Sequence, residues 1–375
     1  MKNFKWLGIA LLIIACLLFA VACDSSDASD NTTTGADVTT SSDPEQTTTG
    51  ANADQTPTVD PQNCAHENLT ETVVTPALAL KDGEKLVKCS SCGTEKTEVI
   101  PMTKTLKVLC IGNSFTVDPC WHLWGICNDA GIENVVVATL FIGSCTFRIH
   151  WNNIKYDYHN YGYYKATAEG DMVLQRNVSA QEAFDDEDWD AFVFHQSGLR
   201  ARTNDPSLIT TEDTLKELPL IVDHVKKQFP NALMYYQMSW AYQSDCTQTE
   251  FVKFYGGSQQ KNYESVVTAV RDIVPKMNLF DGYLYVGAAA QNLRTSYVGD
   301  TITRDGYHLN YGYGRYMASL TWYTTLSGGS IDNITWTPSK YSADINAKMP
   351  LIKESISNAL KNPFEITQSQ YTTKP

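Results

Sequence analysis

The sequence lacks an excess of positive charge, since 29 Lys and Arg residues stand against 42 Asp and Glu residues and the formal net charge is −13. Nucleic-acid binding needs a basic surface, so this composition argues against it. The chain also lacks a Walker phosphate loop, an HExxH metal motif and a Gly-x-Ser-x-Gly elbow. These absences disfavour P-loop chemistry, a catalytic metal and the α/β-hydrolase fold. We expect no catalytic cofactor.

A long hydrophobic run occurs at the N-terminus, where residues 7–21 are apolar and follow a short basic start. The run ends in small residues before Cys23. This pattern resembles a bacterial lipoprotein signal, with residues 1–22 as the signal peptide and Cys23 as the lipidated first residue. An uncleaved N-terminal anchor is the alternative, although the run is short for a stable span. Both interpretations predict an exported protein, held at the outer face of the cytoplasmic membrane.

Residues 23–61 contain very few large apolar side chains and are rich in Thr, Ser and Asp. Such a segment buries too little surface to offset its chain entropy. We therefore expect a disordered tether between the lipid anchor and the rest of the chain.

A small module is predicted for residues 62–102, with Cys64 and His66 at one end and Cys89 and Cys92 at the other. A Cys-x-x-Cys turn followed by glycine is typical of zinc sites, and a module of this size needs such a staple. The four side chains are therefore candidate ligands of a structural zinc ion. A disulfide and free thiols remain the alternatives.

The main domain is predicted for residues 103–328, followed by a C-terminal extension over 329–375. Short apolar runs that suit strands alternate here with longer runs that suit helices. Strands that are apolar on both faces indicate a parallel sheet covered on both sides, which predicts a three-layer α/β/α sandwich. The expected strands are 106–111, 135–140, 191–194, 232–238 and 283–286, and the expected helices are 120–130, 212–229, 263–277 and 288–297. The Tyr-rich segment 147–178 is interpreted as an insertion near the cleft.

One set of residues supplies a nucleophile, a base and an orienting carboxylate. Ser114 follows the first expected strand of the main domain, and Asp305 and His308 form an Asp-x-x-His pair near its end. A serine alcohol needs a base within hydrogen-bond reach, and imidazole titrates near neutral pH. A carboxylate can then fix the tautomer of that imidazole. The three residues predict acyl transfer at Ser114.

The blocks that carry these residues resemble the SGNH/GDSL hydrolase superfamily over roughly residues 106–326. They are Gly112-Asn-Ser-Phe-Thr116, Ile142-Gly-Ser144, Phe194-His-Gln-Ser197 and Asp305-x-x-His308. The resemblance is greatest to an incompletely characterised branch with the Gly-Asn-Ser-Phe-Thr form. It implies a flavodoxin-like α/β/α fold and a carboxylic ester hydrolase.

Two positions depart from the usual pattern of that superfamily. Asn113 stands where an aspartate is usual, and Gln196 stands where an asparagine would help to bind the oxyanion. Negative charge on the attacked carbonyl oxygen requires preorganised donors. We expect these to be the backbone N–H groups of Ser114 and Gly143 and the side-chain amide of Gln196.

Aromatic residues near the motifs suggest a sugar substrate, since flat rings stack on the C–H faces of sugars. We assign His150, Trp151 and Trp240 to substrate contacts. The resulting prediction is an extracytoplasmic serine esterase that removes O-acetyl or similar acyl groups from carbohydrate. The alternative is a non-catalytic glycan-binding lipoprotein that keeps the fold.

Overall fold

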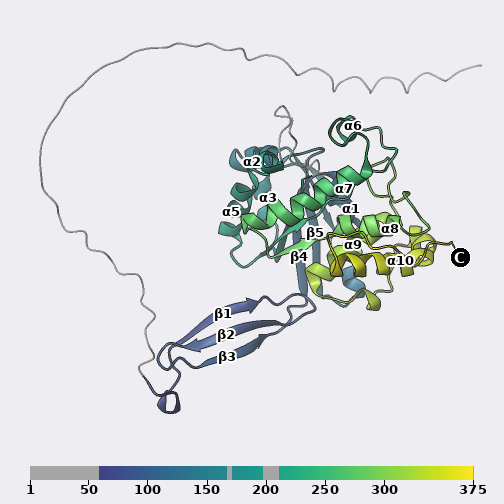
Figure 1. The fold of residues 1–375 in the computed structure, drawn as a ribbon. Helices are drawn as coiled ribbons and strands as arrows, with labels where there is room; N and C mark the ends of the chain where they lie inside the picture. Colours follow the sequence, from purple (N-terminus) through teal and green to yellow (C-terminus); the bar gives the residue numbers. More distant parts are fainter. Residues whose placement is uncertain (1–58, 167–170, 197–210, 375) are drawn as a thin grey trace, which may run out of the picture. The chain divides into compact units, whose positions relative to one another are not determined.

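The computed structural model describes residues 59–166, 171–196 and 211–374 (Figure 1). The predicted signal peptide, Cys23 and most of the predicted tether lie outside these ranges. Two sheets are present in the described part of the chain, one of three strands and one of seven. Among the same residues, no helix is both long enough and apolar enough to cross a membrane.

The larger sheet has the order β10-β9-β8-β4-β5-β6-β7. Its strands are β4 (Thr105–Gly112), β5 (Asn134–Phe141), β6 (Tyr161–Ala166), β7 (Val173–Val178), β8 (Ala191–Phe194), β9 (Leu233–Gln237) and β10 (Gly282–Leu284). The five strands β5, β4, β8, β9 and β10 are parallel, while β6 pairs antiparallel with β5 and β7 pairs antiparallel with β6 at that edge. The predicted α/β fold is thus confirmed, with a mixed rather than wholly parallel sheet.

The chain reverses its direction of travel across the sheet at β4. It moves from β4 to β5 on one side, and later from β8 to β9 on the other side of β4. Ligands of doubly wound sheets bind beyond the carboxyl ends of the strands at such a switch point. Ser114 is the second residue after the end of β4 and therefore lies at this position.

Helices form a layer on each face of the sheet (Figure 1). The crossovers β4-α1-β5 and β8-α5-β9 run in opposite directions, so right-handed connections place α1 and α5 on opposite faces. One layer contains α1 (Ser114–Asp129), α8 (Val286–Arg294), α9 (Tyr313–Ser327) and α10 (Ser342–Lys361), which pack on one another. In the other, α2 (Phe147–Lys155) contacts α3 (Ala180–Phe184) and α5 (Leu218–Gln228).

Several short helices complete the domain. They are α4 (Thr211–Thr214), α6 (Thr249–Tyr255), α7 (Gln259–Thr268), a π-helical turn Ala269–Ile273 and the 3-10 turns Val274–Met277, Ile331–Asn333 and Ser339–Tyr341. The long helix α10 belongs to the predicted C-terminal extension, and its buried Ile345 and Ile352 join the same core as the sheet. The extension is therefore packed into the domain.

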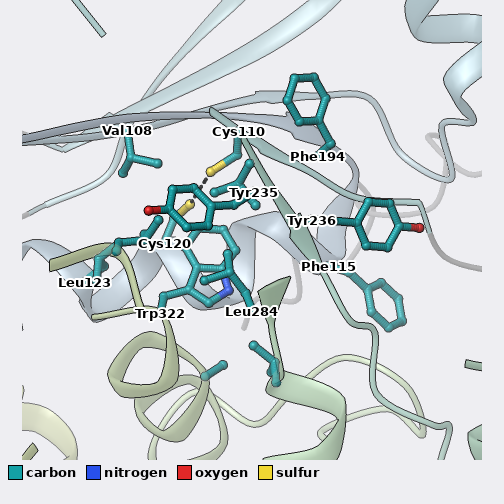
Figure 2. Close-up of a cluster of buried hydrophobic side chains, with 14 of the residues drawn as sticks. Val108, Cys110, Phe115, Cys120, Leu123, Phe194, Tyr235, Tyr236, Leu284 and Trp322 are labelled. Atoms are coloured by element: carbon teal, nitrogen blue, oxygen red, sulfur yellow. Dashed lines mark hydrogen bonds between the residues drawn. The ribbon is translucent and has the colours of Figure 1, made fainter. Parts of the chain in front are cut away.

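The core beneath the candidate site contains side chains from β4, α1, β8 and β9 (Figure 2). Phe115, the residue after Ser114, is 3% exposed and lies in this cluster. Cys110 and Cys120 contact each other there with their sulfur atoms 3.5 Å apart. Burial of Phe115 fixes the first turn of α1, and with it the backbone of Ser114.

The smaller sheet is an antiparallel meander in the predicted Cys/His module. It consists of β1 (Leu69–Thr75), β2 (Gly83–Cys89) and β3 (Glu95–Ile100), after a 3-10 turn at Pro61–Asn63. All seven residues of β1 are exposed. The sheet has little core of its own, which agrees with the need for a staple inferred from the length of the module.

Candidate active site

The turn between β4 and α1 is shaped by Gly112 and Asn113. A Cβ atom on Gly112 would lie 2.5 Å from the Cγ2 atom of Thr116, so only glycine fits there. Asn113 caps α1 by accepting a hydrogen bond from Phe115 N at 3.1 Å, and its Nδ2 donates to the carbonyl oxygen of Cys145 at 3.3 Å. An aspartate could cap the helix but could not make this second donation. The Asn113 departure thus ties the turn to the loop that holds Gly143.

The structure brings Ser114, His308 and Asp305 together. The Nε2 atom of His308 lies 2.7 Å from Oγ of Ser114, and its Nδ1 lies 2.6 Å from Oδ2 of Asp305. A neutral imidazole that carries its proton on Nδ1 donates to the carboxylate and accepts from the serine hydroxyl. The side chains of His308 and Asp305 are 15% and 40% exposed. This chain of contacts can move a proton from the serine to the imidazole.

Asp305 also organises the loop that carries His308. Its Oδ1 accepts a hydrogen bond from His308 N at 2.8 Å, with a weaker one from Tyr307 N at 3.3 Å. Partial burial acts to raise the pKa of the Asp305 carboxyl, but the hydrogen bonds from His308 and Tyr307 outweigh it and hold the pKa below its usual value. The carboxylate is therefore charged at neutral pH and can stabilise an imidazolium.

Asp118 connects the nucleophile helix to this loop, and sequence reasoning missed it. It is fully buried one turn after Ser114, and it accepts from the backbone N–H of Leu309 at 2.9 Å. It also accepts from Arg304 Nη1 at 3.0 Å and from Arg315 Nε at 2.7 Å. The spacing of four residues from Ser114 could have indicated a shared helix face. Nothing local could have indicated partners more than 180 residues away.

Ser114 and His308 open into a cleft of about 910 Å³. One wall is a face of α1, with Val117, Trp121 and Gly125 following Ser114 at helical spacing. The other walls come from β5, β6, the loop before α9 and the C-terminal segment. The aromatic lining residues are Trp121, Trp124, Phe141, Tyr164, Tyr311, Trp336 and Tyr341, and the charged ones other than His308 are Asp118, Asp171, Arg304, Arg315 and Lys340.

The far end of the cleft depends on Gly125. A Cβ atom there would lie 2.4 Å from the indole ring of Trp336, so the glycine allows Trp336 to pack directly on α1. Asp129 at the end of α1 accepts from Trp336 N at 2.9 Å and holds the segment in place. The predicted C-terminal extension thereby contributes to the cleft, which its sequence gave no reason to expect.

Two predicted oxyanion residues, Gly143 and Gln196, do not line this cleft. Gly143 is exposed, and among the described residues a Cβ atom on it would meet Phe141 at 3.9 Å. Gln196 is buried, and its Oε1 accepts from Phe147 N at 2.6 Å. This bond fixes the amide plane and leaves the amide nitrogen as the donor. Their role in binding an oxyanion remains a prediction.

The predicted substrate residues lie away from the cleft lining. His150 is fully buried, stacks on Tyr161 and places Nδ1 3.0 Å from the Tyr161 hydroxyl, while burial lowers its pKa to about 3. Trp151 is half-buried and lies edge-on to His224. These positions do not allow His150 to touch a substrate in the cleft.

Trp240 lies beneath the loop of the base rather than in the cleft. It is 1% exposed and stacks on Phe115 with ring centroids 4.5 Å apart. Its Nε1 donates to the carbonyl oxygen of Tyr307 at 2.6 Å. The side chain of an aromatic residue just after a strand end can point into either the core or the cleft. Here Trp240 points into the core, where it packs on Phe115. Trp240 thus supports the loop next to His308.

The four predicted ligands of the module form a cluster that could hold a metal ion. The Sγ atoms of Cys64, Cys89 and Cys92 and a ring nitrogen of His66 all lie within 4.8 Å of one another. The Cys92 sulfur is 3.3 Å from Nδ1 of His66, and the Cys64 and Cys89 sulfurs are 3.7 Å apart. Hydrogen bonding to Thr94 outweighs the effect of burial and lowers the pKa of the Cys92 thiol to about 7. Thiolate is the form that binds metal.

Comparison with known proteins places this arrangement in a family. The family model for the domain of unknown function DUF4886 matches residues 107–351, which span the sheet, the triad and the cleft. The chain belongs to the DUF4886 family. A crystal structure of a DUF4886 family protein from Bacteroides uniformis ATCC 8492 is similar at 28% identity and a TM-score of 0.61, covering 72% of this chain and 100% of that chain.

Two more distant structures resemble this DUF4886 chain at 12% identity. One is a protein from Parabacteroides merdae ATCC 43184 described as a GDSL-like lipase, with a TM-score of 0.38 and coverage of 60% of this chain and 97% of that one. The other is the acetyl xylan esterase AlAXEase, with a TM-score of 0.29 and coverage of 59% and 100%. A search of curated proteins gave no match.

Proposed function

We propose that this DUF4886 protein is a serine esterase that removes acyl groups from carbohydrate. The observation that carries the proposal is the contact of His308 Nε2 with Ser114 Oγ at 2.7 Å, with Asp305 on the other ring nitrogen at 2.6 Å. Nucleophile, base and orienting carboxylate in this geometry are the requirement for acyl transfer at serine.

The reaction would proceed in two balanced halves. His308 takes the hydroxyl proton as Ser114 Oγ bonds to the carbonyl carbon, and the resulting oxyanion is stabilised by N–H donors. The bond to the leaving alkoxy oxygen then breaks as the imidazolium returns the proton to it. Water repeats the sequence on the acyl-enzyme, which releases the acid and restores Ser114. The N–H groups of Ser114 and Gly143 and the Gln196 amide are the proposed donors.

The lining of the cleft supports a carbohydrate substrate. Aromatic faces such as those of Trp121, Tyr164 and Trp336 can stack on sugar rings, while the polar residues between them can meet hydroxyl groups. A lipid substrate would favour a lining with fewer charged side chains than this one has. Hydrolysis of an acylated glycan uses both the triad and the aromatic walls.

Hydrolysis of p-nitrophenyl acetate tests this proposal, with Ser114→Ala as the inactive variant. Ser357→Ala on α10, outside the cleft lining, is the matched control and should retain wild-type activity. Acetate release from acetylated polysaccharides then identifies the preferred glycan. If the wild type and Ser114→Ala are equally inert, the esterase proposal fails and a non-catalytic glycan-binding role takes its place.

We further propose that the Cys/His cluster of the module binds a zinc ion. Three thiolates and one imidazole form a ligand set that tetrahedral structural zinc sites use. The zinc would stabilise the β1–β3 meander, whose strands bury few side chains. We also propose that export and lipidation at Cys23 tether the enzyme to the membrane surface, where a polysaccharide substrate would be met.

A further inference from the structure

Two arginines share a single carboxylate on the wall of the cleft. Arg304 Nη1 and Arg315 Nε both donate to Oδ1 of Asp118, at 3.0 and 2.7 Å. The side chain of Arg315 is 7% exposed, that of Arg304 is 21% exposed, and Asp118 is fully buried. Within the part of the chain that the structure describes, Asp118 is the ion-pair partner of both guanidinium groups, so one positive charge of the pair is uncompensated there in a poorly hydrated place. Such a charge is costly unless an anion binds beside it.

The guanidinium planes are fixed by aromatic rings. Arg315 lies over Trp121 and Tyr311, with its Cζ 4.3 and 4.6 Å from the ring centroids, and Arg304 lies 4.7 Å from the centroid of Tyr311. Stacking holds the planes while the N–H edges remain available for bonding. Within the described residues, the terminal nitrogens Nη1 and Nη2 of Arg315 have no hydrogen-bond partner, although this side chain lines the cleft.

The arginine pair is close to the proposed nucleophile. Asp118, which binds both guanidinium groups, is four residues after Ser114 on α1, and Trp121 is seven residues after it. One helical turn rises about 5.4 Å, so Asp118 lies about one turn from Ser114. One small substrate can therefore reach both the arginine pair and the proposed nucleophile. Arg304 is also the residue directly before Asp305. The pair and the triad therefore face one ligand.

The other charged residues of the cleft lining are compatible with a bound anion. Among the described lining residues, Lys340 is exposed on the C-terminal wall and adds a third cation, while Asp171 is the second carboxylate. Asp171 forms no ion pair within the part of the chain that the structure describes. A cleft with this surplus of cations contrasts with the net charge of −13 for the whole protein.

From these contacts we infer that the cleft recognises a carboxylate, and that the substrate is an acylated acidic carbohydrate containing uronic acid residues. A planar guanidinium matches a carboxylate through two parallel hydrogen bonds, which the terminal nitrogens of Arg315 can supply. The inference rests on the proposed esterase function, since it specifies the substrate of the same site. Arg315 supplies the main contact and Lys340 contributes longer-range attraction.

Competition against p-nitrophenyl acetate measures this preference directly. Unesterified oligogalacturonate is compared with neutral galacto-oligosaccharide of the same length. The acidic sugar should inhibit at a concentration about tenfold lower, as one charge-assisted contact allows. Raising the salt concentration from about 0.05 M to about 0.5 M should reduce that advantage, because screening weakens partly exposed pairs.

Variants separate recognition from folding. Arg315→Gln should abolish the preference for the acidic sugar and leave inhibition by the neutral sugar unchanged. Because Arg315 also contacts Asp118, Lys340→Gln on the exposed wall provides a second variant that should reduce the preference severalfold. Lys361→Gln at the end of α10, outside the cleft, changes the net charge equally and should retain the wild-type preference.

Failure of the carboxylate site and failure of the esterase function give different results. Equal inhibition by both sugars, in an enzyme that hydrolyses the ester through Ser114, would overturn the carboxylate site and leave the esterase intact. If no hydrolysis occurs, the proposed function fails, and calorimetric titration of the protein with the same two sugars still tests the site. Tighter binding of oligogalacturonate, lost in Arg315→Gln, would support the site, and equal or no binding would overturn it.

Discussion

The buried carboxylate of Asp118 accepts a hydrogen bond from the backbone N–H of Leu309 at 2.9 Å. Asp118 lies on the helix that begins with Ser114, and Leu309 directly follows His308. A single side chain therefore fixes the separation between the proposed nucleophile and its base. Displacements of about 1 Å in such a pair can cost about 100-fold in rate, so loss of this contact should slow the proposed reaction.

Replacing Asp118 with asparagine should reduce both activity and stability. The amide keeps an acceptor for Leu309 but leaves two guanidinium groups without an anion, which costs roughly 3 kcal/mol for a buried pair. We expect kcat on p-nitrophenyl acetate to fall at least tenfold and the urea midpoint to decrease. Asp272→Asn removes an exposed ion pair and should change neither quantity. Wild-type kcat in Asp118→Asn would show that this contact does not position the triad.

Gln196→Glu tests the proposed oxyanion donor. Glutamate keeps the oxygen that accepts from Phe147 N but removes the amide donor. Loss of one such donor should lower kcat by about 100- to 1,000-fold with little change in KM. Steady-state kinetics of the folded variant give the answer. A pure KM effect would instead assign Gln196 to substrate binding.

The stability of the protein should depend on pH through Asp305. The pKa of this carboxyl is lower in the folded chain than in the unfolded chain, because hydrogen bonds from His308 and Tyr307 outweigh the effect of burial. Its contribution to stability is fully present above the unfolded pKa of about 3.9 and is lost as the pH falls through the folded pKa. Unfolding of wild type and Asp305→Asn at pH 7 and near pH 3 checks this. The difference between the two proteins should shrink at the lower pH, and a constant difference would contradict the assignment.

The module should contain one zinc ion per chain. Elemental analysis of the purified protein measures the content, and Cys89→Ser or Cys92→Ser should abolish it because each removes a thiolate ligand. Cys246→Ser alters a buried cysteine outside the cluster and should leave the zinc in place. A folded protein without zinc, with a mass two protons lower than that of the reduced chain, would indicate a disulfide.

The strands were the most predictable part of the structure. The run expected at 191–194 coincides with β8, and the run at 106–111 lies within β4. β8 is buried and apolar throughout, and β4 is buried and largely apolar from Val108 onward, as expected for strands covered on both faces. The segment 147–178 was harder to predict, because β6 buries Tyr161, Tyr163 and Ala166 while the residues between them, which include Gly162 and Lys165, are half-buried. It forms α2, β6 and the edge strand β7.

The grouping of Ser114, Asp305 and His308 could be predicted from motifs, whereas its surroundings could not. Ser114, Asp305 and His308 have chemistry that few other combinations in the chain offer. Asp118 resembles an ordinary helix carboxylate in sequence, and its role comes from partners far along the chain. Trp240 was expected in the cleft and lies in the core instead, because sequence does not specify which way an aromatic ring turns at the end of a strand.

The most direct test of the account is covalent labelling of the protein with a fluorophosphonate, followed by intact mass measurement and peptide mapping. We expect a single adduct on Ser114, formed about 100-fold more slowly in His308→Ala because the base is missing. The absence of an adduct in the wild-type protein, or equal labelling of Ser114→Ala, would contradict the claim that Ser114 is an activated nucleophile.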